Sequence, residues 1–305
     1  MSSGGGNKAV VAALAANLGI ALTKLLAFLL TGSSSMLAEG IHSLADSGNQ
    51  LLLLIGGKRS RREATARHPF GYGRERYIYA FIVSVVLFSV GGLFALYEGV
   101  HKLQHPEAIT SWQWVPVVVL VVAIGLEGFS FRTAIHETNL VRGGASWPQF
   151  IRHARAPELP VVLLEDSAAL VGLVLALFGV GMTLGTGNGI WDGVGTLGIG
   201  VLLVVVAVIL AIETKSLLIG ESATSDQVTA IEAALSGVDG VERIIHMRTL
   251  YLGPDELLVA AKIAVGHDDS AGAVAAAIDA GEARIRAAVP IAQVIYLEPD
   301  IYRKA

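Results

Sequence analysis

Long apolar stretches separated by short polar segments dominate the first two thirds of the chain. A membrane-spanning helix needs about 20 mainly apolar residues. We expect such helices at residues 8–31, 36–57, 77–101, 113–135, 158–184 and 191–213. The second is the least apolar, but its LLLLIGG end and the preceding TGSSS turn support a helix. The residues before the first stretch are too polar for a signal-peptide core, so we expect that helix to be retained.

The pattern changes near Glu221, where amphipathic segments replace the apolar stretches. The segments are predicted helices at Asp226–Leu235 and Ala271–Ala288, and predicted strands at Glu242–Tyr251, Glu256–Val265 and Gln293–Leu297. The order α-β-β-α-β indicates a small, ferredoxin-like α+β domain. We therefore expect an all-α, six-helix transmembrane domain at residues 1–215 and a cytoplasmic α+β domain at residues 216–305.

Basic residues collect in two of the polar segments. Seven Lys or Arg residues lie between the second and third predicted helices, and three lie between the fourth and fifth. Positive residues accumulate on the cytoplasmic side of membrane proteins. We expect a multi-pass protein of the bacterial inner membrane with both termini in the cytoplasm.

Composition narrows the chemistry. The net charge of −4 gives no basic footprint for nucleic acid. Because the chain has no cysteine, disulfides and thiolate metal sites are excluded, and His, Asp and Glu remain as metal ligands.

The second predicted helix carries a polar face. Glu39, His42 and Asp46 are spaced three and four residues apart, which places them on one side of a helix. His42 and Asp46 would lie about 6 Å apart along the axis. A histidine and a carboxylate one turn apart can hold one divalent ion. The alternative is a polar seam of hydrogen bonds between helices, a role that also suits Asn49.

Carboxylates also lie in the fourth, fifth and sixth helices. Glu165 and Asp166 are adjacent, so their side chains diverge by about 100°. We expect Asp166 to be the inward ligand, with Glu165 as a further ligand, a supporting group or the partner of a basic residue. The alternative is that both are interfacial charges. Glu127 either carries protons or makes a structural hydrogen bond. Asp192 is either an outer-mouth residue or a charge at a helix N-terminus, and we favour the latter. The glycines at 193, 195, 198 and 200 predict close helix packing.

Together these motifs resemble the cation diffusion facilitators, also called the zinc-transporter family. The resemblance rests on TGSSSMLAEGIHSLADSGNQ, HPFGYGRER, LLEDSAALVGL and the α-β-β-α-β tail. The chain looks closest to the branch with HxxxD on helix two and LLED on helix five. The resemblance implies a homodimer, a metallochaperone-like cytoplasmic domain, and zinc or a similar ion bound between helices two and five and exported in exchange for protons.

By position, His42 and Asp46 match the two ligands on helix two, and Asp166 matches the second ligand on helix five. The first falls at Val162, which cannot bind metal, so Glu165 is the candidate substitute, ahead of Glu39 or water. Glu39, Asn49 and Glu127 are expected to support the site or carry protons.

The cytoplasmic sites of the family look incomplete in this sequence. His246 matches a common ligand, but the later strands offer Lys262, Tyr296 and Glu298. Tyr72 stands where a histidine is frequent, although His68 remains. We therefore expect no binuclear site in the tail and a role in dimerisation. His267, Asp268 and Asp269 are interpreted as a solvated loop.

The predicted function is divalent cation efflux by Zn²⁺/H⁺ antiport, with alternating access and without an organic cofactor. One imidazole with two or three carboxylates also suits Mn²⁺, Fe²⁺ or Co²⁺. An intramembrane metalloenzyme is the first alternative, but no HExxH or other added base is present. The second is a metal sensor or structural dimer that has lost transport. The predicted partners are the ion, protons, the lipid bilayer and a second copy of the chain.

Overall fold

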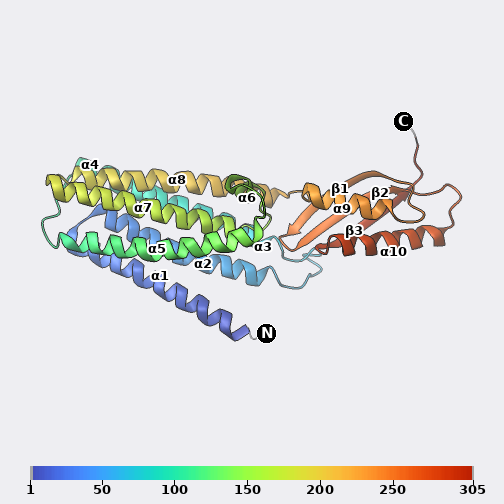
Figure 1. Cartoon of the computed structure of the whole chain (residues 1–305), viewed down its shortest axis with the longest axis horizontal. Coiled ribbons are helices and arrows are strands. Elements are labelled where there is room, and N and C mark those ends of the chain that lie inside the picture. The colour runs from blue at the N-terminus through green and yellow to red at the C-terminus, as the bar shows by residue number, and fades with distance from the viewer. Residues whose placement is uncertain (1–2, 304–305) are drawn as a thin grey trace. The chain divides into compact units, whose positions relative to one another are not determined.

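The computed structural model describes the backbone of residues 3–303 and the side chains of residues 17–303. The chain separates into two compact units, which are residues 3–56 with 78–215, and residues 57–77 with 216–303. Figure 1 shows the first as a bundle of long helices and the second as a small unit that contains three strands.

The first unit is built from long helical stretches. They are α1 (Ser3–Thr31), α2 (Ser34–Arg59), α5 (Trp114–Val141), α7 (Glu158–Thr186) and α8 (Ile190–Ile219), together with a continuous run of α3 (Glu75–Val86), η1 (Leu87–Leu93) and α4 (Phe94–Gln104). Each stretch overlaps one of the six predicted spans. The short helix α6 (Trp147–His153) was not predicted, although Ser146 and Gln149 form a capping box at its start.

Four of these stretches are long and apolar enough to cross a membrane, namely residues 75–104, α5, α7 and α8. The described part of α1, Asn17–Thr31, is apolar but shorter. Helix α2 is not among the four, in keeping with its predicted polarity. Its polar face is turned inward, with Glu39, His42 and Asn49 buried, whereas Leu51 and Leu54 are exposed. The polar face is buried and the apolar face is exposed, which is the reverse of a helix in a soluble protein. This arrangement suits a helix whose outer face contacts lipid.

Helix α8 packs closely through its glycines, as predicted. A Cβ added at Gly200 would lie 2.7 Å from the backbone nitrogen of Leu96, and one at Gly195 would lie 2.9 Å from the carbonyl of Leu175. Real Cβ atoms essentially never approach other heavy atoms so closely. The small residues therefore allow α8 to contact both α4 and α7 at backbone distance.

The second unit has the predicted α-β-β-α-β order. Its elements are α9 (Ser225–Ser236), β1 (Arg243–Gly253), β2 (Glu256–Ala264), α10 (Ala271–Ala288) and β3 (Ala292–Asp300). The sheet order is β1-β2-β3, with β1 antiparallel and β3 parallel to β2. Alternate β2 residues Leu257, Val259 and Ile263 are buried in a core with α9 and α10, which gives the sheet one apolar face.

Residues 57–77, which hold the HPFGYGRER motif, belong to the second unit. Thr65 and His68 exchange backbone hydrogen bonds of 3.0 and 3.1 Å. Gly71 has a φ of 73°, a conformation that favours glycine. Arg76 donates to Asp255 at 2.7 Å. These contacts give the HPFGYGRER segment a defined turn.

Candidate metal site

His42 and Asp46 meet on the buried face of α2, one turn apart. The Nε2 atom of His42 lies 3.4 Å from Oδ2 of Asp46, and 1% of the His42 side chain is exposed. Among the described residues, both ring nitrogens of His42 and Oδ1 of Asp46 have no hydrogen-bond partner. Leaving a buried polar group unpaired costs about 1–3 kcal/mol. A cation bound to the imidazole and the carboxylate would remove this cost.

The two carboxylates of α7 turn toward different helices, because adjacent helical residues diverge. Asn49 of α2 donates to Oε1 of Glu165 at 2.7 Å. Ser130 of α5 donates to Oδ2 of Asp166 at 3.0 Å. The sequence predicted the divergence and favoured Asp166 as the inward ligand, without naming the partner of either side chain. In the structure Glu165 contacts the helix that carries His42, and Asp166 contacts α5.

The predicted ligands do not form one complete site in this structure. In the part of the chain with described side chains, no group of three His, Asp or Glu residues could hold a metal ion. The structure brings His42 and Asp46 together, whereas Glu165 and Asp166 are held by Asn49 and Ser130. Glu127 is partly buried on α5, one turn before Ser130. Val162, at the position of the missing ligand, is also partly buried.

Lys24 of α1 was missed by the sequence analysis. Its side chain is buried, and its Nζ donates to Oε2 of Glu39 at 3.0 Å and to Oγ of Ser43 at 2.7 Å. Glu39 is thus part of a buried ion pair. A usable signal was present, since a lysine inside the apolar run ALTKLLAF is costly unless it has a partner.

Asp192 is also buried, at the start of α8. Its carboxylate accepts hydrogen bonds from the backbone nitrogens of Ser34 and Ser35 at 2.7 and 3.2 Å, and from Oγ of Ser33 at 2.9 Å. Asp192 lies in the first turn of α8, as predicted, and its carboxylate also caps the N-terminus of α2. This contact fixes the start of the helix that carries His42.

In the second unit, strand register aligns His246 with Lys262 and Lys262 with Glu298. The Nζ of Lys262 lies 3.0 Å from Oε1 of Glu298 and 3.1 Å from Oδ2 of Asp300. Hydrogen bonds to these two carboxylates raise the pKa of Lys262. The ammonium group of Lys262 therefore lies between the carboxylates of Glu298 and Asp300.

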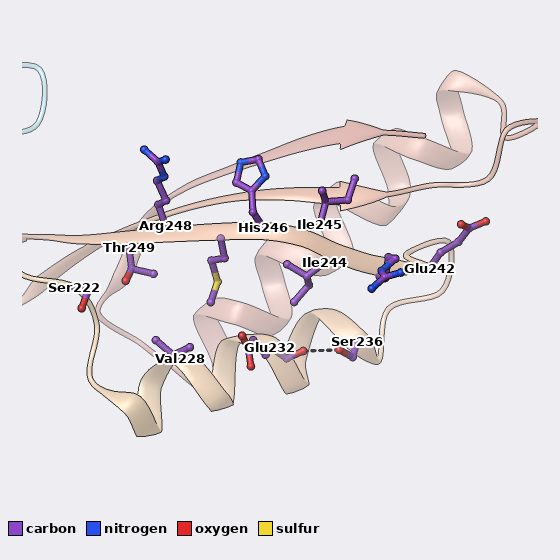
Figure 2. Close-up of a pocket in the computed structure, with 12 residues that line it drawn as sticks. Ser222, Val228, Glu232, Ser236, Glu242, Ile244, Ile245, His246, Arg248 and Thr249 are labelled. Carbon is purple, nitrogen blue, oxygen red and sulfur yellow. Dashed lines mark hydrogen bonds between the residues drawn. The ribbon is translucent and has the colours of Figure 1, made fainter. Parts of the chain in front are cut away.

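A pocket of about 800 Å³ is lined by residues of α9, β1 and the segments before them, including Val228, Met247 and His246. In Figure 2, His246 and Arg248 project from the side of β1 opposite α9.

His267 is 84% exposed beside Asp268, in keeping with a solvated loop.

Comparison with protein families matches residues 10–219 to the cation efflux transmembrane domain. The chain is 36% identical over 261 residues to the proton-coupled zinc antiporter SLC30A9, mitochondrial, of Xenopus laevis, covering 85% of this chain and 46% of that protein. It is 29% identical to metal tolerance protein C4 of Arabidopsis thaliana, covering 84% and 56%.

Magnetosome protein MamM of Magnetospirillum gryphiswaldense is 27% identical, covering 74% of this chain and 67% of that protein. A solved MamM C-terminal domain aligns with 26% of this chain and 93% of that chain, at 20% identity and a TM-score of 0.24. The chain spans about half the length of the first curated relatives it matches.

Proposed function

Because the chain belongs to the cation efflux family, we propose that it carries divalent metal cations across a membrane as a Zn²⁺/H⁺ antiporter. The observation that carries this proposal is the buried His42–Asp46 pair, whose unpartnered nitrogen and oxygen atoms are suited to a cation. The name of the Xenopus laevis relative, a proton-coupled zinc antiporter, supports the choice of zinc and of protons.

The proposed ligands are His42 and Asp46 of α2 with Asp166 and Glu165 of α7. Zn²⁺ takes four nitrogen, oxygen or sulfur ligands in tetrahedral geometry, and these four side chains supply one nitrogen and three carboxylates. The α7 carboxylates reach the ion by giving up their hydrogen bonds to Asn49 and Ser130. Exchange of these two hydrogen bonds for metal bonds is the structural change that we expect on loading.

Proton coupling follows from the chemistry of the ligands. Metal-bound imidazole and carboxylates must be deprotonated, so ion binding releases protons. Reprotonation from the opposite side then weakens the site and releases the ion. Glu127, one turn from Ser130 on α5, is the candidate proton carrier near Asp166. The cycle requires no ATP.

We further propose that the protein is a homodimer of the bacterial inner membrane with both termini in the cytoplasm. The basic segments between α2 and α3 and between α5 and α7 support this orientation. In the second unit, the ion pairs of Lys262 with Glu298 and Asp300 argue against a metal ion between these carboxylates.

Manganese, ferrous iron or cobalt is the second candidate substrate. The observation that favours these ions is the excess of carboxylates over imidazoles around α2 and α7, because oxygen ligands suit harder cations. Competition between the ions at one concentration separates the two candidates.

Purified full-length protein in liposomes with an imposed pH gradient tests the proposal. We expect zinc uptake that follows the gradient and collapses when nigericin, in potassium buffer, dissipates it. Metal binding without gradient-dependent flux would contradict antiport and favour the sensor alternative.

A further inference from the structure

Lys24 places a positive charge inside the helical unit, beside the face of α2 that carries the proposed ligands. The side chains of Lys24 and Glu39 are 1% and 0% exposed. A lysine at the centre of a membrane helix costs about 2.5–3.5 kcal/mol on insertion scales, so its charge needs a local partner. Glu39 supplies the charge, at 3.0 Å, and the Ser43 hydroxyl accepts a second bond at 2.7 Å.

Glu39 has the spacing of a metal ligand. It precedes His42 by three residues, and Glu-x-x-His on one helix lets both side chains reach a common ion, as in di-iron helical bundles. Glu39, His42 and Asp46 also share the buried face of α2. Without Lys24, the Glu39 carboxylate would be an additional oxygen ligand one turn from His42.

Oε2 of Glu39 is bound by the Lys24 side chain, whereas Oε1 has no hydrogen-bond partner among the described residues. Oε1 lies against α7, where a Cβ added at Gly172 would come within 2.7 Å of it. The carboxylate is therefore tied to α1 on one side and enclosed by α7 on the other.

We propose that Lys24 is a specificity-determining residue: it withholds Glu39 from the ion bound at His42 and Asp46 and so limits the number of oxygen ligands. A site with four ligands favours tetrahedral Zn²⁺. One further carboxylate moves the site toward Mn²⁺, which prefers oxygen ligands and octahedral geometry. This inference rests on the proposed transport function.

Initial uptake rates of Mn²⁺ and Zn²⁺ into proteoliposomes that hold the full chain test the inference. In Lys24→Met we expect the Mn²⁺/Zn²⁺ rate ratio to rise about tenfold, since partners of metal ligands change metal affinity by about 10–100-fold. The double variant Lys24→Met with Glu39→Gln should return to the wild-type ratio, because its amide does not bind metal as a carboxylate does. Lys24→Arg, which keeps the ion pair, should also keep the ratio.

An unchanged ratio in a folded, transporting Lys24→Met variant overturns the inference, as does a raised ratio that persists in the double variant. If Lys24→Met does not fold, X-ray absorption spectroscopy tests the inference instead. It compares the ligand shell of bound zinc in wild type with that in Glu39→Gln. We expect the same ligand shell in both, and loss of an oxygen ligand in Glu39→Gln overturns the inference. A wild type that transports neither ion contradicts the proposed function instead, so the two failures are distinguishable.

Discussion

The carboxylate of Asp192, on α8, accepts a hydrogen bond of 2.7 Å from the backbone nitrogen of Ser34, the first residue of α2. The first amides of a helix have no partner within it, and a carboxylate there also interacts favourably with the helix dipole. This contact ties α8 to the start of the helix whose polar face holds His42 and Asp46.

Removing this cap should destabilise the helical unit. Asp192→Ala leaves buried amide donors of α2 unpaired, at a cost of about 1–3 kcal/mol. Thermal unfolding in detergent measures the effect. Asp226→Ala, which removes an exposed carboxylate from the first turn of α9, is the matched control and should shift stability by less than about 0.5 kcal/mol. Equal, small shifts in both variants would remove the assigned role of Asp192.

The contact between α8 and α4 predicts a sharp difference between two glycines. In Gly200→Ala the new Cβ meets the backbone of Leu96, so we expect a loss of about 1–3 kcal/mol from overpacking. In Gly181→Ala, on α7, the new Cβ meets nothing within 4 Å. That variant should be neutral or slightly stabilised. Similar unfolding midpoints for the two variants would contradict the close packing of α8.

The Lys262 ion pairs predict a pH dependence of the second unit. The hydrogen bond from Lys262 lowers the pKa of Asp300 below its ordinary value of 3.8. The carboxylates of Glu298 and Asp300 raise the pKa of Lys262 above its ordinary value of 10.5. The stabilisation of the folded state by ionised Asp300 is fully present above the pKa of this group in the unfolded chain. It is lost as pH falls through the lower pKa of Asp300 in the folded state. The stabilisation by protonated Lys262 is fully present below the pKa of this group in the unfolded chain, and it is lost as pH rises through the raised pKa in the folded state.

The stability difference between wild type and Lys262→Met should therefore be constant near neutral pH and shrink at both extremes. Hydrogen exchange of β3 amides across pH measures it. The control is Arg248→Met, which removes an exposed cation that register places opposite Ala260. A stability difference between wild type and Lys262→Met that stays constant down to the pH of acid unfolding would argue against the ion pairs of Lys262.

Pattern and spacing predicted much of this fold because they report on local structure. The six helical stretches, the α-β-β-α-β order and the meeting of His42 with Asp46 all follow from periodicity. The bounds of α10, Ala271–Ala288, agree with the prediction at both ends. Polar residues on α2 marked its buried face before any contact was known.

The contacts that the sequence left open join different helices. Lys24 finds Glu39 across 15 residues, and Asp192 finds Ser34 across 158. For the adjacent residues Glu165 and Asp166, the sequence favoured Asp166 as the inward ligand, but spacing alone does not say which neighbouring helix faces each of them. The choice between them depends on Asn49 and Ser130, which lie on separate helices.

Glu165 of α7 should contribute to ion selection. Because the site needs a fourth ligand in place of Val162, we expect Glu165→Ala to lower zinc affinity by at least about tenfold. Asn49→Ala, which frees Glu165 from its hydrogen bond, should preserve or increase affinity. Competitive transport of Zn²⁺, Mn²⁺, Fe²⁺ and Co²⁺ measures both. Unchanged zinc competition in Glu165→Ala would exclude Glu165 as a ligand.

Zinc flux driven by a pH gradient tests the His42–Asp46 pair most directly. The comparison uses wild type, the His42→Ala with Asp46→Ala double variant, and Leu44→Ala as a control on the exposed face of the same helix. We predict that the double variant, folded and reconstituted at equal density, loses gradient-driven zinc uptake, whereas Leu44→Ala keeps it. Uptake at the wild-type rate in the double variant would contradict the assignment of His42 and Asp46 as the ion's ligands.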